Sequence, residues 1–336
     1  MRVLQPAQVL YDGETLPVFL PACDHYAGSE KLMRKSLDLQ RTMGTVFDVT
    51  LDCEDGAQVG REAEHAELVA SLLGSEHHGS GRVGVRIHDF RNAAWREDVR
   101  IIITHARRPP AYITLPKVRS VAEVIEMCTY IEASRRHAAI MRAIPVQVLI
   151  ETHGALADVA AIAALPPVEA LSFGLMDFVS AHHGAIPDSA MRSPGQFEHP
   201  LIVRAKSDIA AACHAHGKVA SHNVCTDVSD PNVAADDAAR ARFQFGYTRM
   251  WSIHPAQIAP IVQAFAPQDE EIALAVAVLR QAADNHWGPT RHADRLHDRA
   301  SYRYYWTVLR QAKASGRMLP PQAELFFQQA DDSDDA

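Results

Sequence analysis

The stretch PVQVLIETHGALADVAAIAALPPVEALSFGLMD, residues 145–177, contains the repeating unit of the fold. An apolar run at 145–152 carries Glu151 near its end, and a helix-like segment follows at 155–164. A second apolar run at 168–177 ends in Asp177. A short strand, a helix and another short strand predict two parallel strands joined by a crossover helix.

The same alternation extends in both directions from this unit. Helix-like periodicity recurs at 29–43, 121–134, 202–216 and 255–266. Eight strands over about 250 residues match a closed (β/α)8 TIM barrel. An open doubly wound sheet would normally carry a Gly-rich phosphate turn after an early strand, and none occurs. The other predicted strands are 16–24 (LPVFLPACD), 46–54 (VFDVTLDCE), 83–88 (VGVRIH), 111–117 (AYITLPK), 218–224 (KVASHNV) and 249–255 (RMWSIHP).

The chain continues beyond the predicted barrel domain, residues 1–266. Residues 267–330 predict a helical C-terminal extension, with helices at 269–287 and 299–314 and a polar link between them. The acidic segment 331–336 (DDSDDA) is expected to be a disordered, solvated tail. Because two helices cannot form a core alone, we expect them to cover the barrel as a lid or to contact a neighbouring subunit. That expectation favours a homo-oligomer, a trimer or a hexamer.

Composition excludes several classes of protein. The 336 residues are 47% apolar and carry a net charge of −8, which argues against a nucleic-acid binder. No run of 18 apolar residues occurs, so no membrane span is expected, and no secretory signal begins the sequence. The five cysteines are scattered without a Cys-x-x-Cys pair, which favours reduced thiols and a cytoplasmic location.

Acidic side chains follow adjacent strands at the rim where barrel chemistry occurs. Glu151 and Asp177 each lie just past an apolar run, and two carboxylates with open positions suit Mg²⁺ or Mn²⁺. Arg86, on the strand at 83–88, suits a substrate carboxylate or keto acid. A metal bound to a 2-oxo acid stabilises an adjacent enolate, as aldol cleavage requires.

Each of these residues has a simpler interpretation. A single acid at a strand end often caps the next helix. Glu54 and Asp55 fit either a turn role or an outer-shell acid that orders metal-bound water. Lys117 fits an ion-pair partner in this acid ring better than a Schiff-base nucleophile. Histidines near the predicted rim raise a zinc alternative, although no zinc spacing occurs; they are His153, His182, His183, His222 and His254.

Several motifs together resemble the HpcH/HpaI aldolase–citrate lyase family, in its citrate-lyase-β-like and malyl-CoA-lyase-like branch. The resemblance implies a Mg²⁺-dependent TIM barrel that makes or breaks a carbon–carbon bond in 3-hydroxy-acyl substrates, commonly CoA thioesters. It implies that Glu151 and Asp177 bind the metal, that Arg86 binds the substrate carboxylate, and that Asp298 comes from a C-terminal lid. The motifs, in the family's order, are FDVTLDCEDG (47–56), VRIH (85–88), TLPKV (114–118), VLIETHGAL (148–156), LSFGLMDF (171–178) and WSIHPAQI (251–258).

The sequence also departs from the family pattern. The opening strand lacks the family's arginine, which favours a substrate without CoA. Arg86 is followed by Ile87-His88-Asp89 instead of the common Val-Asn, and residues 180–188 replace a plainer loop. The leading hypothesis is a metal-dependent lyase for a 3-hydroxy-dicarboxylate or its CoA thioester, of the citryl-, malyl- or citramalyl-CoA type. The alternatives are a free 2-keto-acid aldolase and a non-catalytic barrel paralogue.

Roles follow from this hypothesis. Small carboxylates or acyl-CoA are the expected partners. The residues expected to act in catalysis are Arg86, Asp298 and Asp55, and those expected to contact substrate are Arg86, Glu54, Lys117 and Met176.

Overall fold

The computed structural model describes residues 5–11, 13–14, 16–57 and 59–327. Two compact units are present: one spans Val18–Phe265, and the other combines the chain segments before and after it. The predicted domain of residues 1–266 differs from this division at its amino end, because the first helix groups with the C-terminal segments. The predicted tail, residues 331–336, lies outside the described residues.

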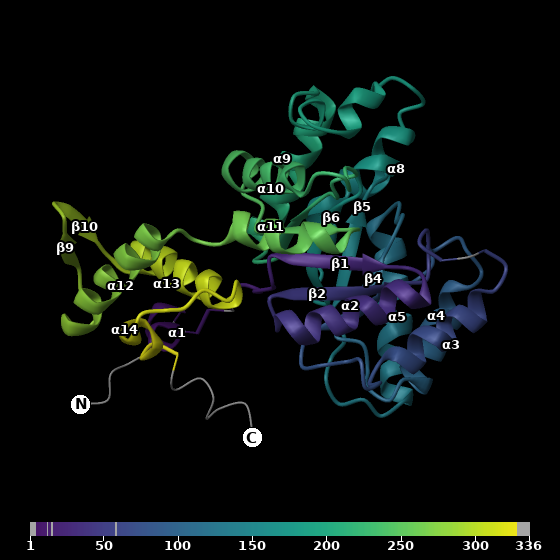
Figure 1. The fold of residues 1–336 in the computed structure, drawn as a ribbon, viewed down its shortest axis with the longest axis horizontal. Helices are drawn as coiled ribbons and strands as arrows, with labels where there is room; N and C mark the ends of the chain where they lie inside the picture. Colours follow the sequence, from purple (N-terminus) through teal and green to yellow (C-terminus); the bar gives the residue numbers. More distant parts are fainter. Residues whose placement is uncertain (1–4, 12, 15, 58, 328–336) are drawn as a thin grey trace. The chain divides into compact units, whose positions relative to one another are not determined.

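The Val18–Phe265 unit is a closed barrel of eight parallel strands, which confirms the predicted (β/α)8 fold (Figure 1). Each strand pairs with the next along the chain, and β1 closes the barrel by pairing with β8. The register sets Asp52 directly opposite Arg86. The strands are β1 (Cys23–Ala27), β2 (Phe47–Asp52), β3 (Val83–Arg86), β4 (Ile113–Leu115), β5 (Val146–Ile150), β6 (Val168–Phe173), β7 (Val219–His222) and β8 (Arg249–Ser252).

Helices connect successive strands, and α2 illustrates why they form. Its N-cap residue Ser29 accepts the backbone N–H of Leu32, and its buried face carries Met33 and Leu37. The helices of this unit are α2 (Glu30–Met43), α3 (Glu62–Leu72), α4 (Trp95–His105), α5 (Val121–His137), α6 (His153–Ala157), α7 (Val159–Ala163), α8 (Leu175–Ser180), α9 (Pro200–Ala215), α10 (Pro231–Phe245) and α11 (Pro255–Phe265), with 3₁₀ turns η1 (Asp188–Met191) and η2 (Gly195–Phe197).

Two predicted elements of the barrel were wrong in their bounds. The first strand begins at Cys23 and not at residue 16, because Pro17 and Pro21 cannot donate ladder hydrogen bonds. The helix predicted at 155–164 is two short helices that meet at Asp158. The Asp158 carboxylate accepts the backbone N–H of Val121, which ties this break to the start of α5.

The amino end of the barrel interior is filled by charges. Arg249, fully buried, lies 2.9 Å from carboxylate oxygens of both Asp24 and Asp48. Arg82 pairs with Asp48 and Glu169 and extends the cluster toward solvent. We call these five residues the amino-end network. Its three acids are the second residues of their strands, Arg249 is the first residue of β8, and Arg82 lies just before β3.

The second unit has its own apolar core. The described residues of its helices are α1 (Pro6–Tyr11), α12 (Asp269–Asp284), α13 (Arg299–Ala314) and α14 (Pro321–Glu324). Leu10 and Tyr11 from α1 pack with Tyr302 and Trp306 of α13. The C-terminal helices thus share a core with α1, which the sequence did not reveal; that they also cover the barrel or contact a neighbouring subunit stays a prediction.

The link between these helices is also more regular than predicted. Residues 288–298 contain an antiparallel pair, β9 (Thr290–His292) and β10 (Arg295–His297). Ala293 and Asp294 connect them with φ of 44° and 62°, as a two-residue hairpin turn requires.

Two expectations from composition can be compared with the described residues. None of their helices is long and apolar enough to cross a lipid bilayer. All five cysteines are free thiols, and four of them are buried.

Candidate active site

Arg86 ends β3 with its guanidinium held by the last residue of β2. Nε donates to Oδ1 of Asp52 at 2.7 Å and Nη2 donates to Oδ2 at 2.6 Å, a bidentate pair. The same carboxylate accepts the backbone N–H of Glu54 at 3.0 Å and of Gly56 at 2.9 Å. Asp52 therefore fixes both the arginine and the turn that carries the next two acids. The arginine is 7% exposed.

Lys117 and two acids continue this arrangement as a ring. The Lys117 ammonium donates to Glu54 and to both carboxylate oxygens of Asp55, at 2.7 and 2.8 Å. Glu54 also lies 3.2 Å from Nη1 of Arg86. We call Asp52, Glu54, Asp55, Arg86 and Lys117 the carboxyl-end ring. Lys117 thus forms ion pairs with the acids of the ring, as the sequence predicts.

The two acids of the ring respond differently to their surroundings. Burial raises the pKa of Glu54 above its usual value, and Arg86 and Lys117 offset this only in part. Burial also acts to raise the pKa of Asp55, but hydrogen bonding and attraction from Lys117 outweigh burial and lower it. Asp55, with its side chain 56% exposed, is thus the more firmly ionised of the pair.

Glu151 follows β5 directly and is 3% exposed. Its Oε1 accepts the backbone N–H of Lys117 at 2.6 Å. Burial, and then the negative charge of Asp177, raise the pKa of Glu151 to about 8. A buried carboxyl that interacts with a second acid is an arrangement that a cation stabilises.

Gly174 makes the position of Glu151 possible. A Cβ atom at residue 174 would lie 2.1 Å from Oε2 of Glu151, closer than any real side chain tolerates. Asp177 follows three residues later, in the first turn of α8, where it is half-buried. The Gly174-to-Asp177 segment thus brings the two predicted metal ligands together from neighbouring strands.

Two predicted site residues remain, Met176 and Asp298. Met176 is 40% exposed on α8, beside Asp177. Asp298 belongs to the other unit, where its Oδ1 accepts the backbone N–H groups of Ala300 and Ser301 and caps α13. A capping role accounts for the side chain locally, and a lid role for Asp298 stays a prediction.

The zinc alternative gains no support from the structure. Within residues 5–11, 13–14, 16–57 and 59–327, no three His, Cys, Asp or Glu side chains group as a metal site. His222 is fully buried and contacts Lys206 instead of facing an open rim. His153 and His182 stack with ring centroids 4.5 Å apart.

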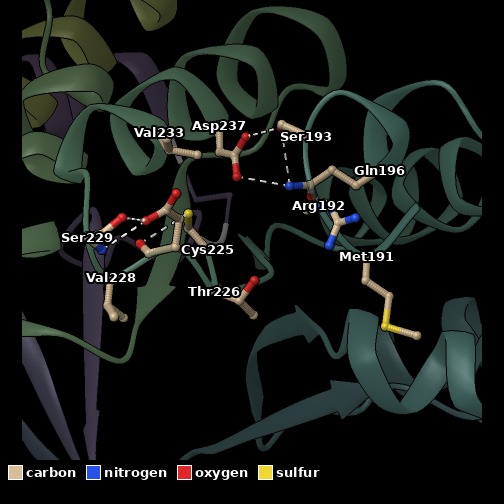
Figure 2. A pocket seen from close by; sticks show the side chains of 11 residues that line it. Met191, Arg192, Ser193, Gln196, Cys225, Thr226, Val228, Ser229, Val233 and Asp237 are labelled. Atoms are coloured by element: carbon tan, nitrogen blue, oxygen red, sulfur yellow. Dashed lines mark hydrogen bonds between the residues drawn. The ribbon is translucent and has the colours of Figure 1, made fainter. Parts of the chain in front are cut away.

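A polar pocket of about 530 Å³ lies beyond β7, between the η1–η2 segment and the start of α10 (Figure 2). Gln196 donates to Asp237 at 2.9 Å, and Ser193 donates to the other oxygen of that carboxylate. Lys206, which is buried and does not line the pocket, donates to Gln196 and Asn223. Both oxygens of the Asp237 carboxylate therefore already accept hydrogen bonds from side chains of the protein.

Sequence reasoning missed two partners of the rim. Asp52 was seen at the end of its strand but received no role; its direct register with Arg86 was the missing signal. His88 was noted only as a departure, and Asp98, ten residues later on α4, was not considered. The structure joins His88 to Asp98 at 2.6 Å.

Comparisons with known proteins show the family of the chain. The family model described as HpcH/HpaI aldolase/citrate lyase matches residues 38–255. An L-malyl-CoA/beta-methylmalyl-CoA lyase from Cereibacter sphaeroides is 28% identical over 278 residues, which cover 79% of this chain and 87% of that protein. A citrate lyase subunit beta-like protein from Mycobacterium tuberculosis is 30% identical over 69% of this chain and 75% of that protein.

Solved structures show the same similarity. A crystal structure of a citrate lyase from Burkholderia xenovorans is 68% identical, with a TM-score of 0.84 over 96% of this chain and all of that one. The CitE protein of Mycobacterium tuberculosis, solved with magnesium, acetoacetate and coenzyme A, shares the fold at 22% identity. Its TM-score is 0.66, over 88% of this chain and 98% of that one. The chain therefore belongs to the HpcH/HpaI aldolase/citrate lyase family and is classed with its lyases.

Proposed function

We propose that this protein is a divalent-metal-dependent lyase that cleaves or forms a carbon–carbon bond in a 3-hydroxy-dicarboxylate or its CoA thioester. The observation that carries the proposal is the pair Glu151 and Asp177 at neighbouring strand ends, on the same rim as the Arg86 ring. A simple capping role for Glu151 is disfavoured, because its carboxyl is buried and its pKa is raised to about 8.

The acid pair suits Mg²⁺ or Mn²⁺. Glu151 and Asp177 would hold the cation, since hard oxygen ligands and open positions are what these ions take from proteins. When bound, the ion supplies electrophilic stabilisation of the enolate that carbon–carbon cleavage generates. Complexes of the Mycobacterium tuberculosis relatives contain magnesium with acetoacetate and coenzyme A or with oxaloacetate, and this supports the same cofactor here.

Arg86 is proposed to bind the keto-acid end of the substrate. Nε and Nη2 donate to Asp52 and Nη1 faces Glu54, but each Nη carries two hydrogens, so donors remain for a substrate carboxylate. Asp52 holds this fork in one orientation before substrate arrives, which lowers the entropy lost on binding. Glu54 and Lys117 form the border of the same site.

Proton transfer is assigned to two acids. Asp55, held by Lys117 and half-exposed, is proposed to order water at the site. Asp298 is the second candidate, and Met176 is proposed to line the substrate site.

The main test measures cleavage of malyl-, citramalyl- and citryl-CoA with Mg²⁺ and again with excess EDTA. We expect turnover that EDTA removes and Mg²⁺ restores. Glu151→Ala and Asp177→Ala should each abolish turnover while the circular dichroism spectrum is unchanged. Turnover indifferent to EDTA, or normal turnover in either variant, would show that the metal assignment is wrong.

A free 2-keto-acid aldolase is the second candidate, favoured by the opening strand. That strand reads Cys23–Ala27 without the arginine that CoA phosphates would meet in the family pattern. Thermal-shift screening with pyruvate, glyoxylate, oxaloacetate, acetyl-CoA and CoA separates the two, because ligands that bind the native state raise the melting temperature. Stabilisation by keto acids and not by CoA compounds would favour the aldolase.

We further propose a cytoplasmic homo-oligomer, a trimer or a hexamer. The free, buried thiols are consistent with a reducing compartment. Analytical ultracentrifugation of the full chain would give the assembly directly, and a monomer at micromolar concentration would contradict the proposal.

A further inference from the structure

Two aromatic side chains occupy the barrel interior between the amino-end network and the carboxyl-end ring. Tyr26 lies two residues after Asp24 on β1, and Trp251 lies two residues after Arg249 on β8. Side chains two residues apart on a strand point to the same side, which here is the interior. Both aromatic residues are buried, and their ring centroids lie 4.7 Å apart with 59° between the ring planes. The two rings therefore pack as one unit.

The face of the Tyr26 ring contacts Arg86. The central guanidinium carbon of Arg86 lies 5.4 Å from the centroid of this ring, within the usual range of a cation–π interaction. A buried cation needs neighbours that compensate for the water it has lost. Asp52 and Glu54 do so, but each contacts nitrogen atoms of the guanidinium. An aromatic face attracts the cation from another direction, so N–H groups remain for a substrate carboxylate.

Trp251 connects this ring to the side of the barrel that carries the proposed metal ligands. Its Nε1–H donates to the backbone carbonyl oxygen of Phe173 at 3.3 Å. Phe173 ends β6, directly before the Gly174-to-Asp177 segment. Leu149 of β5 belongs to the same apolar cluster as the two rings. The cluster is therefore in contact with β5 and β6, the strands that the two predicted metal ligands follow.

We propose that Tyr26 and Trp251 are positioning residues for the substrate site. The Tyr26 face holds the Arg86 guanidinium, and Trp251 holds the Tyr26 ring relative to the end of β6. The inference rests on the lyase function proposed above and adds two residues that support its substrate-binding arginine. Because a guanidinium that is fixed before substrate arrives loses less freedom on binding, the pair strengthens binding of the keto-acid end.

The contact with Arg86 can be measured without substrate. In full-length protein labelled with ¹⁵N-arginine, the Nε–H signal of Arg86 is the one that Arg86→Lys removes. We expect Tyr26→Leu to shift this signal, because the ring current of the aromatic face is lost, and Tyr26→Phe to leave it nearly unchanged. Trp251→Leu should shift it less, because the Tyr26 ring stays but loses its support. Tyr304→Leu, at an exposed tyrosine on α13, is the matched control. An Arg86 signal that Tyr26→Leu or Trp251→Leu leaves in place would overturn the role of that residue.

Electrostatic attraction and packing are separated by pentafluorophenylalanine at position 26. Fluorination nearly preserves the size of the ring but reverses the charge of its face, so the attraction for the guanidinium is lost. Oxaloacetate binding is measured by calorimetry with saturating Mg²⁺. We expect Tyr26→Phe to bind within about twofold of wild type, and the fluorinated protein to bind about fivefold more weakly.

The outcomes of this measurement are distinct. Equal affinity of the fluorinated and Tyr26→Phe proteins would overturn the cation–π role and leave the lyase proposal intact. A loss in Tyr26→Phe as large as that in the fluorinated protein would assign the effect to the hydroxyl and overturn the role of the ring. No binding by wild type would instead contradict the substrate class, and the binding role of the pair with it, whereas the measured contact between Tyr26 and Arg86 would still hold.

Discussion

The two ends of the barrel interior use the same side chains for different purposes. The amino-end network centres on Arg249, with 0% exposure, between two acids that are also buried. The carboxyl-end ring centres on Arg86, but its outer members are open, with the Lys117 side chain 26% exposed and that of Asp55 56% exposed. Both are arginine–carboxylate clusters, but the Arg249–Asp24–Asp48 centre of the first is closed to solvent, and only Arg82 at its edge is exposed, at 35%.

That difference determines what each cluster can do. In the amino-end network, burial raises the pKa of Asp48 to about 6, although Arg249 and Arg82 oppose the rise. Arg249, Asp24 and Asp48 are closed to solvent, so no substrate reaches these three and their charges can only affect folding. At the carboxyl end, Arg86 keeps free donors and the charged form of Glu151 is unfavourable, with a pKa of about 8, so a ligand can improve on the resting state. Stability and function are thus placed at opposite ends of the same strands.

Arg249→Met gives the largest expected effect. It leaves Asp24 buried without a cation and Asp48 with Arg82 alone, and removing one partner of a buried ion pair typically destabilises a protein by about 3–5 kcal/mol. We expect a loss of this size in the free energy of unfolding, measured by urea denaturation. Arg34→Met, which removes an exposed ion pair with Glu30 on α2, is the control and should change little. Equal effects from the two substitutions would contradict the proposed division.

Arg86→Lys tests the other end of the comparison. Lysine keeps the charge but cannot form the bidentate pair with Asp52 and still offer a fork to substrate. We expect kcat/KM for the cleaved substrate to fall about 100-fold, which corresponds to about 2.7 kcal/mol. The free energy of unfolding should change less than in Arg249→Met. Arg96→Lys, at an exposed pair with Glu126, is the matched control. A variant that unfolds easily but turns over normally would reverse our assignment.

The sequence predicted part of the rim and none of the amino-end network. Glu151 and Asp177 were predicted because each lies just past an apolar run, and Arg86 because it lies on the strand at 83–88; parallel strands bring such ends together. Arg249 and Asp48 also sit in apolar runs, yet their pairing depends on barrel closure between β8 and β2 across β1, which no local pattern reports. The contribution of α1 to the C-terminal unit was missed for the same reason, because α1 and α13 meet across most of the chain.

Glu151→Gln tests the carboxyl end of the barrel through the pH dependence of the free energy of unfolding. The folded pKa of Glu151, about 8, lies above its ordinary value, so the stability it contributes is present below about pH 4.5 and lost as pH rises through 8. Glutamine is neutral and still accepts the Lys117 N–H. Without divalent metal at pH 8, we expect this variant to be more stable than wild type by on the order of 2 kcal/mol. The gain should vanish near pH 4.5. Glu76→Gln, at a side chain 88% exposed, should show no such trend. If Glu151→Gln were less stable than wild type at pH 8, the charged form of Glu151 would not be unfavourable in the folded protein.

Lys117→Met gives the smallest expected effect and bears most directly on exposure. Lys117 pairs with two acids, as Arg249 does, but it is partly solvated and water can replace it. Glu54 would keep Arg86 as a partner at 3.2 Å, so no buried acid is left alone. We therefore expect a loss of only about 1 kcal/mol in urea denaturation. Lys31→Met, an exposed lysine on α2, is the control. A loss as large as that from Arg249→Met would mean that the number of acid partners, and not their access to water, determines the stability of these clusters.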